Sequence, residues 1–172
     1  MMGVDEEDDK GMGNDDLVGK VQAQAPPTKS SPIGEIFYGY LMLCANSFQP
    51  AMGYLYRALA LQQSDPLLCL LCGVASLGRS TNRQVDNRNH TIIQGMALFT
   101  HYAELRGDIP EVDYNFARAY HHLNLVHLAV PRYERVLERA SSKASKGTFD
   151  MAREAAFNLA MIFTPVSYTH LT

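Results

Sequence analysis

The sequence of 172 residues contains no tryptophan, only three cysteines and no long apolar stretch. Three cysteines are too few for a disulfide framework, and this favours a reducing compartment such as the cytosol or the nucleus. No segment approaches the roughly 18–20 uninterrupted apolar residues that a membrane-spanning helix requires. The first twenty residues also lack the basic start and apolar run of a secretory signal. We therefore expect no membrane partner.

An excess of basic charge is also absent. The formal net charge is −3, and charged residues make up 19% of the chain. Residues 1–16 hold seven acidic side chains and a single lysine, so the rest of the chain carries only a small positive charge. A module that binds phosphate backbones by counterion release is expected to be much more basic. The composition therefore argues against direct DNA binding.

Residues 1–32 combine this acidic run with several glycines and prolines and few large apolar side chains. Burial there cannot offset the entropy lost on ordering the chain, so we predict a disordered acidic arm. The arm is either a solvated tail or an electrostatic contact for a basic partner.

Beyond the arm, apolar residues recur with helical spacing, and no sustained alternation indicates strands. The polar stretch 79–90 has no periodicity and is predicted to be an extended loop, which is either solvated or a contact for an acidic protein or a nucleic-acid backbone. Helices are predicted at about 33–46, 50–62, 66–78, 91–106, 111–124, 127–140 and 149–163.

Small residues recur at fixed intervals in these helices. Gly39 and Gly73 are 34 residues apart, the period of the tetratricopeptide (TPR) repeat, a pair of antiparallel helices. Ala117 begins a third series with the offsets that follow Gly39. Small side chains at these places let two helices approach closely, and larger ones fill the space beside them. The predicted structural repeat positions are Gly39, Ala51, Leu55, Ala58, Gly73, Ala117, Ala129, Tyr133, Val136 and Ala160.

The predicted fold is therefore all-α, a TPR-like α-solenoid of about three and a half helical hairpins over residues 33–163. The helix at 149–163 has no partner after it, and this leads us to expect that the chain is a fragment. Residues 164–172 continue no repeat and are predicted to be a non-repeat tail of artefactual origin.

No residue pattern in the sequence predicts a catalytic, metal or cofactor site. Cys69 and Cys72 lie inside an apolar run and have no second pair of ligands, so we predict that they are core residues. The adjacent His121 and His122 point about 100° apart on a helix, which is unsuitable for joint metal binding. Phosphate-binding loops, nucleophile elbows and paired carboxylates are missing. We expect a protein that is not an enzyme and needs no cofactor.

Stacked TPR hairpins leave one face of each first helix along a concave groove. About half of the residues expected on this face are apolar, which indicates either a peptide ligand or the next turn of a longer superhelix. Both cases imply a protein partner. The residues predicted to face the groove include Tyr40, Val74, Tyr114, Arg118 and His121.

Residues outside the generic repeat pattern point to one family. The most specific stretch is Tyr114–Ala129, whose Arg118 and His121 are not shared by generic TPR repeats. With it, residues 36–163 resemble the TPR-containing subunit of TFIIIC, a general transcription factor of RNA polymerase III, towards the C-terminal end of its repeats. Further matching motifs are Ser47-Phe48-x-x-Ala51, Ile93-Gln94-Gly95, Tyr102-x-x-Leu105-Arg106-Gly107 and Ala156-Phe157-Asn158-Leu159.

This resemblance implies a scaffold segment in the nucleus that supports initiation at tRNA-type genes through subunit packing and recruitment of TFIIIB. The implied partners are other TFIIIC subunits and, as a further candidate, TFIIIB subunits, with DNA contacted only through the complex. The alternative is an unrelated TPR adaptor that binds a helical or extended peptide in its groove. A clamp for acidic C-terminal peptides is disfavoured, because the first two groove helices carry no basic residue on this face.

Overall fold

In the computed structural model, residues 31–141 and 151–164 are described, and every regular element within them is an α-helix. The all-α fold predicted from the periodicity is therefore confirmed. Most of the predicted acidic arm and of the predicted tail lies outside the described residues. The helices are α2 (Pro32–Cys44), α3 (Phe48–Leu61), α4 (Pro66–Ser80), α5 (Arg88–Arg106), α6 (Pro110–His122), α7 (Val126–Ser141) and α8 (Ala152–Phe163).

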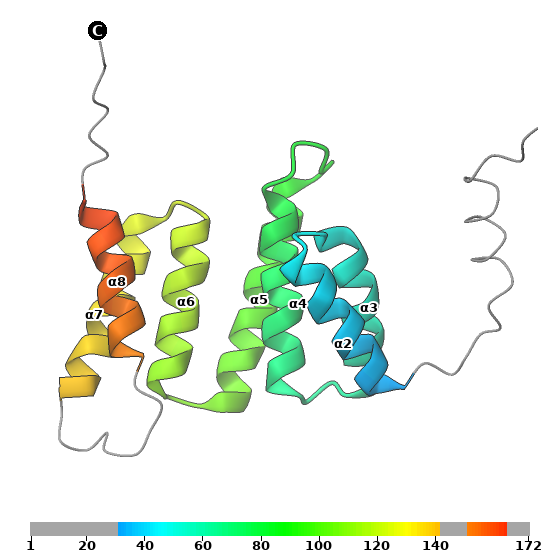
Figure 1. The fold of residues 1–172 in the computed structure, drawn as a ribbon, viewed down its shortest axis with the longest axis horizontal. Coiled ribbons are helices and arrows are strands. Elements are labelled where there is room, and N and C mark those ends of the chain that lie inside the picture. Colours follow the sequence, from blue (N-terminus) through cyan, green and yellow to red (C-terminus); the bar gives the residue numbers. More distant parts are fainter. Residues whose placement is uncertain (1–30, 142–150, 165–172) are drawn as a thin grey trace, which may run out of the picture. The chain divides into compact units, whose positions relative to one another are not determined.

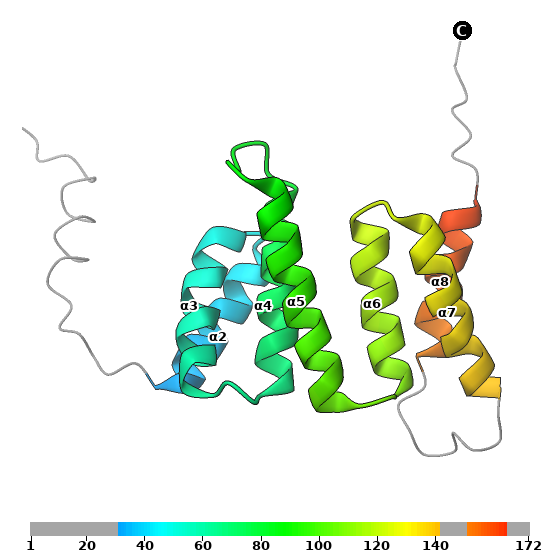
Figure 2. The same cartoon turned by 180° about the vertical axis from the view of Figure 1, so that it is seen from behind.

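The helices form successive antiparallel pairs. The most extensive packing joins α2 to α3, α4 to α5 and α6 to α7, and α8 then packs on α7. In Figure 1 the helices α2 and α8 lie in front of α3 and α7, and Figure 2 brings α3, α5 and α7 to the front. This is the two-layered hairpin arrangement of a TPR-like solenoid.

The loop between α4 and α5 is shorter than its sequence predicts. It was expected over residues 79–90, but α4 continues to Ser80 and α5 begins at Arg88, which leaves residues 81–87. The side chain of Asn87 accepts a hydrogen bond from the backbone N–H of His90 and thereby caps α5. This cap lets the helix start among polar residues, where apolar periodicity gives no signal.

Two helix ends depend on local side-chain chemistry. Asp65 caps α4, because its carboxylate accepts hydrogen bonds from the N–H groups of Leu67 (2.8 Å) and Leu68 (3.2 Å). Pro66 occupies the first turn of α4, where its missing N–H is not needed. Gly107 ends α5 with φ +77°, a conformation that favours glycine.

Glycines at the helix crossings determine how closely the pairs approach. A Cβ atom added to Gly39 would lie 2.6 Å from Cγ of Leu55, and one added to Gly73 would lie 2.7 Å from Cδ2 of Phe99. In the third pair, Ala117 and Ala129 are fully buried. Each crossing therefore has room for no larger residue.

The buried side chains form three clusters that connect each pair to the next. One joins α2, α3 and α4, the second joins α4, α5 and α6, and the third joins α6, α7 and α8. Cys69 and Cys72 are fully buried in the second and first clusters, respectively. Burial raises the pKa of the Cys72 thiol to about 12, so this cysteine packs as a neutral apolar group.

Ala160 differs from the other predicted repeat positions. The residues at the other nine positions are buried, whereas Ala160 is exposed. The face of α8 that contacts the third cluster carries Ala155 and Leu159 instead. No further helix follows α8 within the described residues, so the face with Ala160 has no helix against it.

The crossing geometry predicts opposite effects of the same substitution at two glycines. We expect Gly39→Ala to lower the free energy of unfolding by about 1–2 kcal/mol, because overpacking against Leu55 outweighs the higher helix propensity of alanine. Gly53→Ala, at an exposed position inside α3, is expected to raise it by about 0.5–1 kcal/mol. Urea unfolding of the full chain, followed by circular dichroism, measures both. Equal effects at the two positions would contradict the proposed crossing.

Candidate functional site

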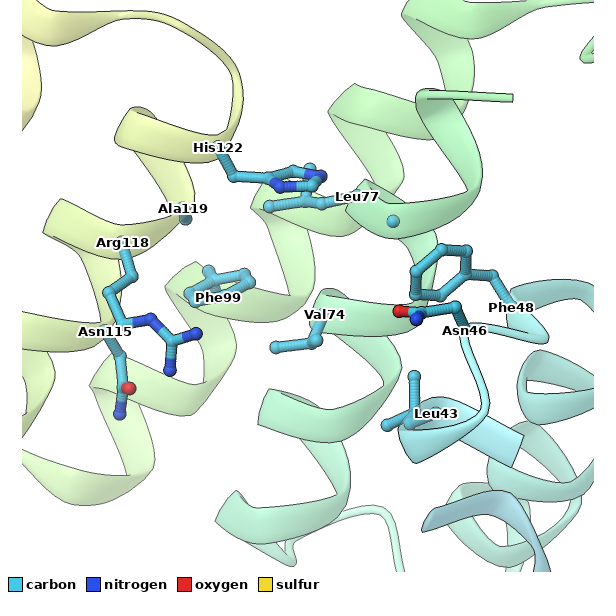
Figure 3. Close-up of a pocket in the computed structure, with 11 residues that line it drawn as sticks. Leu43, Asn46, Phe48, Val74, Leu77, Phe99, Asn115, Arg118, Ala119 and His122 are labelled. Carbon is cyan, nitrogen blue, oxygen red and sulfur yellow. The ribbon is translucent and has the colours of Figure 1, made fainter. Parts of the chain in front are cut away.

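A hollow lies between α2, α4 and α6 and is the first candidate for a binding site (Figure 3). Its volume is about 290 Å³. We call it the apolar hollow because its base is made largely of apolar side chains. The lining residues come from the five helices α2 to α6 and from the turn at Asn46. It is lined by Leu43, Asn46, Phe48, Val74, Leu77, Gly78, Phe99, Asn115, Arg118, Ala119 and His122.

The base of the apolar hollow is held by core packing. Leu77 and Phe99 are each 2% exposed, and the ring of Phe99 packs edge to face against Phe116 with centroids 5.7 Å apart. Val74 is 41% exposed and presents an accessible apolar surface. In Figure 3 the Arg118 side chain extends from α6 towards Phe99 and Val74. The hollow therefore combines a preformed apolar base with a cationic edge.

A second hollow, of about 300 Å³, lies between α6, α7 and α8. We call it the polar hollow, since every residue that lines it carries a polar or ionisable group. Arg118 and His122 also line the apolar hollow, so the two hollows adjoin along α6. The lining residues are Arg118, His121, His122, Tyr133 and Asn158.

Tyr133 lines the polar hollow and has a buried hydroxyl. Its side chain is fully buried, and its oxygen has no hydrogen-bond partner. Burial raises the pKa of Tyr133 to about 12, so the phenol stays protonated and can donate a hydrogen bond. Buried polar groups in folded proteins are nearly always paired, and this hydroxyl is therefore an exception that calls for a ligand or a water.

Tyr102 is a buried tyrosine of the same fold whose hydroxyl is paired. It donates to Oε1 of Glu111 (2.8 Å) and accepts from Nδ2 of Asn115 (2.9 Å). These bonds connect α5 to α6 and fix Asn115 at the edge of the apolar hollow. The comparison shows that the packing of this chain can satisfy a buried phenol, which makes the unpaired hydroxyl of Tyr133 more notable.

Arg118 is exposed and forms no ion pair or hydrogen bond with any residue that the structure describes. The apolar and polar hollows are lined by no aspartate and no glutamate. The guanidinium group is therefore an uncompensated positive charge between the two hollows. An anionic group on a ligand would be attracted to this place.

Two other arginines, by contrast, connect helices through buried acidic partners. Arg57 bonds to Glu35 (2.8 Å) and connects α3 to α2. Arg132 bonds to Asp113 (2.7 Å) and connects α7 to α6. Glu35 and Asp113 each lie four residues before the small residue at a crossing, so this ion pair recurs in the first and third hairpins. These pairs join buried carboxylates of α2 and α6 to arginines of α3 and α7. None of the four residues lines either hollow.

The residues predicted to face the groove are only partly brought together. Val74 lines the apolar hollow, His121 lines the polar hollow and Arg118 lines both. Tyr114 is half-buried, and its hydroxyl accepts a hydrogen bond from Asn158 (3.3 Å). Tyr40 is 53% exposed and lines neither hollow.

Sequence reasoning missed several lining residues. Asn115 and His122 lie three residues before and four residues after Arg118, and this helical spacing alone could have identified them. Asn46, Phe48 and Asn158 come from other elements and needed the fold to be placed.

The described residues contain neither a metal-binding cluster nor a membrane-spanning helix. Within residues 31–141 and 151–164, no three histidine, cysteine or acidic side chains lie together in a way that could hold a metal ion. None of the helices in these ranges is both long and apolar enough to cross a bilayer.

The two buried tyrosines yield a matched prediction. Tyr133→Phe removes an unpaired hydroxyl, so we expect the free energy of unfolding to stay the same or to rise by about 1 kcal/mol. Tyr102→Phe removes two hydrogen bonds and leaves Asn115 and Glu111 without this partner, and it should cost about 1–3 kcal/mol. Denaturant unfolding of both variants measures the difference. A clear loss of stability in Tyr133→Phe would mean that its hydroxyl is already satisfied.

Comparisons with known proteins give three curated relatives, while no protein-family model matches the chain. Transcription factor tau subunit sfc4 of Schizosaccharomyces pombe is 36% identical over 152 residues, which cover 80% of this chain and 15% of that protein. Transcription factor tau 131 kDa subunit of Saccharomyces cerevisiae is 31% identical over 144 residues, 80% of this chain and 14% of that protein. General transcription factor 3C polypeptide 3 of Homo sapiens is 28% identical over 131 residues, 74% and 15% respectively.

The chain thus spans about 15% of the length of the curated relatives that it matches. The similarity covers 74–80% of this chain, and the three relatives are all TFIIIC subunits. The resemblance indicated by the Tyr114–Ala129 stretch is confirmed, and the chain is a relative of one segment of the TPR-containing TFIIIC subunits.

Proposed function

We propose that this chain is a protein-binding scaffold segment of the TFIIIC complex, which supports initiation by RNA polymerase III through subunit packing and TFIIIB recruitment. The observation that carries the proposal is its similarity to three subunits of general transcription factors over 74–80% of its length. The fold agrees with this role, because stacked helical hairpins present extended surfaces for other polypeptides.

Two kinds of surface are available for such contacts. The adjoining hollows along α6 can receive side chains of a partner. The exposed faces of α2 and α8 carry large apolar residues, among them Phe37 (57% exposed) and Phe157 (65% exposed). Exposed apolar patches of this kind are typical of surfaces that pack against other proteins. We assign subunit packing to these faces and partner recognition to the hollows.

In this proposal the chain acts in the nucleus and reaches DNA only through the complex. The low net positive charge of its helical part supports an indirect role, since direct binding to phosphate backbones depends on many cationic contacts. The alternative function is an unrelated TPR adaptor that holds a peptide in its groove. The preformed base of the apolar hollow agrees with this alternative as well as with the scaffold role. The two functions are therefore distinguished by whether the chain assembles with TFIIIC subunits.

An exchange experiment tests membership of the complex. The matching segment of subunit sfc4 in Schizosaccharomyces pombe is replaced by the aligned residues of this chain. We expect the hybrid subunit to co-purify with the other TFIIIC subunits and to support synthesis of precursor tRNA, because the packing faces are retained.

The control is the same exchange with three repeats of an unrelated TPR protein of equal length, which we expect to fail in assembly. If this chain also fails although the hybrid protein accumulates, the scaffold proposal is wrong and the adaptor alternative is favoured.

A further inference from the structure

We infer that the apolar and polar hollows form one seat for a peptide segment of a partner protein, in which a large apolar side chain lies close to a carboxylate. The apolar side chain occupies the apolar hollow, and the carboxylate binds Arg118 and reaches the polar hollow. This inference rests on the proposed function as a protein-binding scaffold and specifies the chemistry of its ligand. The hollows adjoin along α6, so one short segment can occupy both.

The charges around the seat favour a ligand with a negatively charged group. Arg118 has no ionic partner among the described residues, whereas Arg57 and Arg132 are paired with buried acids. No acidic residue lines either hollow. A carboxylate that binds Arg118 therefore gains a charge-assisted hydrogen bond without repulsion from its surroundings.

The hydroxyl of Tyr133 is an independent sign of a missing partner. It is fully buried, unpaired and part of the lining of the polar hollow. Asn158 of α8 lines the same hollow. One N–H of its side-chain amide donates to Tyr114, and the second remains to donate to a ligand. A carboxylate has two oxygens, so one can accept from Arg118. The other can accept from the phenol once the side chains that line the hollow shift to expose the buried hydroxyl. This pairing would give the buried phenol of Tyr133 a partner that no described residue supplies.

The size and chemistry of the apolar hollow suit one side chain. Its volume of about 290 Å³ lies at the lower end of the range for small-molecule pockets. Phe99 and Leu77 form a rigid base, and Val74 contributes an exposed methyl surface. An aromatic or branched aliphatic residue buried here would act as the anchor that gives most of the affinity.

A nucleic-acid ligand is disfavoured by the same residues. Binding to a phosphate backbone needs a row of cations, and the two hollows offer one arginine, with histidines as the other ionisable groups. The apolar base would remain unused by a phosphate chain. We therefore commit to a peptide ligand and treat nucleic-acid binding as an outcome that contradicts the inference.

The test begins with selection from a displayed library of random 12-residue peptides against the full chain. We expect enrichment of peptides with Phe, Leu or Ile close to Asp or Glu. Enrichment of basic peptides, no enrichment at all, or preferential binding of a single-stranded oligonucleotide added as a competitor would overturn the inference.

A double-mutant cycle then locates the carboxylate. For a selected peptide, Arg118→Gln in the chain and Glu→Gln in the peptide should each raise Kd about tenfold. The two changes together should raise Kd little more than either change alone. The matched control is Arg153→Gln, an exposed arginine of α8 that lines neither hollow and should leave Kd unchanged. Additive effects of the two changes would exclude a contact between them.

Two more variants separate recognition from folding. Tyr133→Phe should raise Kd several-fold without lowering the stability of the free chain, and a merely structural tyrosine would not do this. Val74→Glu should abolish binding, whereas Ile93→Glu, at an exposed site outside the hollows, should not. Normal binding by Val74→Glu with a native circular dichroism spectrum would overturn the assignment. If peptide binding fails but the exchanged subunit still assembles, the seat is wrong and the scaffold proposal stands.

Discussion

Close approach of paired helices at residues with little or no side chain is the constraint on which this structure depends. Gly39 lies against Leu55, and Gly73 lies against Phe99, at distances that leave no room for an added Cβ atom. In the third hairpin Ala117 takes the corresponding place and packs in one cluster with Tyr133. The larger residue of each pair fills the space that the smaller one leaves, and this sets the position of one helix on the next.

The binding surface follows from the same contacts. One face of α6 carries Asp113 and Ala117, which join it to α7, and this fixes the direction in which Arg118 and His122 point. Those two residues connect the hollow on the α4 side to the hollow on the α8 side. Paired arginines thus stabilise the hairpins. Arg118 is one of several described arginines without an acidic partner, and its place between the two hollows makes it available to a ligand. On α6, for example, Asp113 pairs with Arg132 of α7, while Arg118 lines the two hollows.

The repeat spacing predicted the crossings because only small residues can occupy them, so Gly39, Gly73 and Ala117 leave a periodic signal in the sequence. The signal failed at Ala160, where no second helix is present within the described residues to require a small side chain. It also gave little information on the hollows. Phe48 and Asn158 come from the start of α3 and from α8, and their proximity to α6 is a result of stacking between hairpins that no local pattern records.

The most direct test of the account is a double-mutant cycle of Gly73→Ala and Phe99→Leu, followed by denaturant unfolding of the full chain. The added Cβ atom overlaps the ring of Phe99, so the smaller leucine should relieve part of the overlap. We expect the double variant to be more stable than the sum of the single effects indicates, by about 1 kcal/mol or more. Additive losses within about 0.5 kcal/mol would contradict the claim that these two residues fit against each other at the helix crossing.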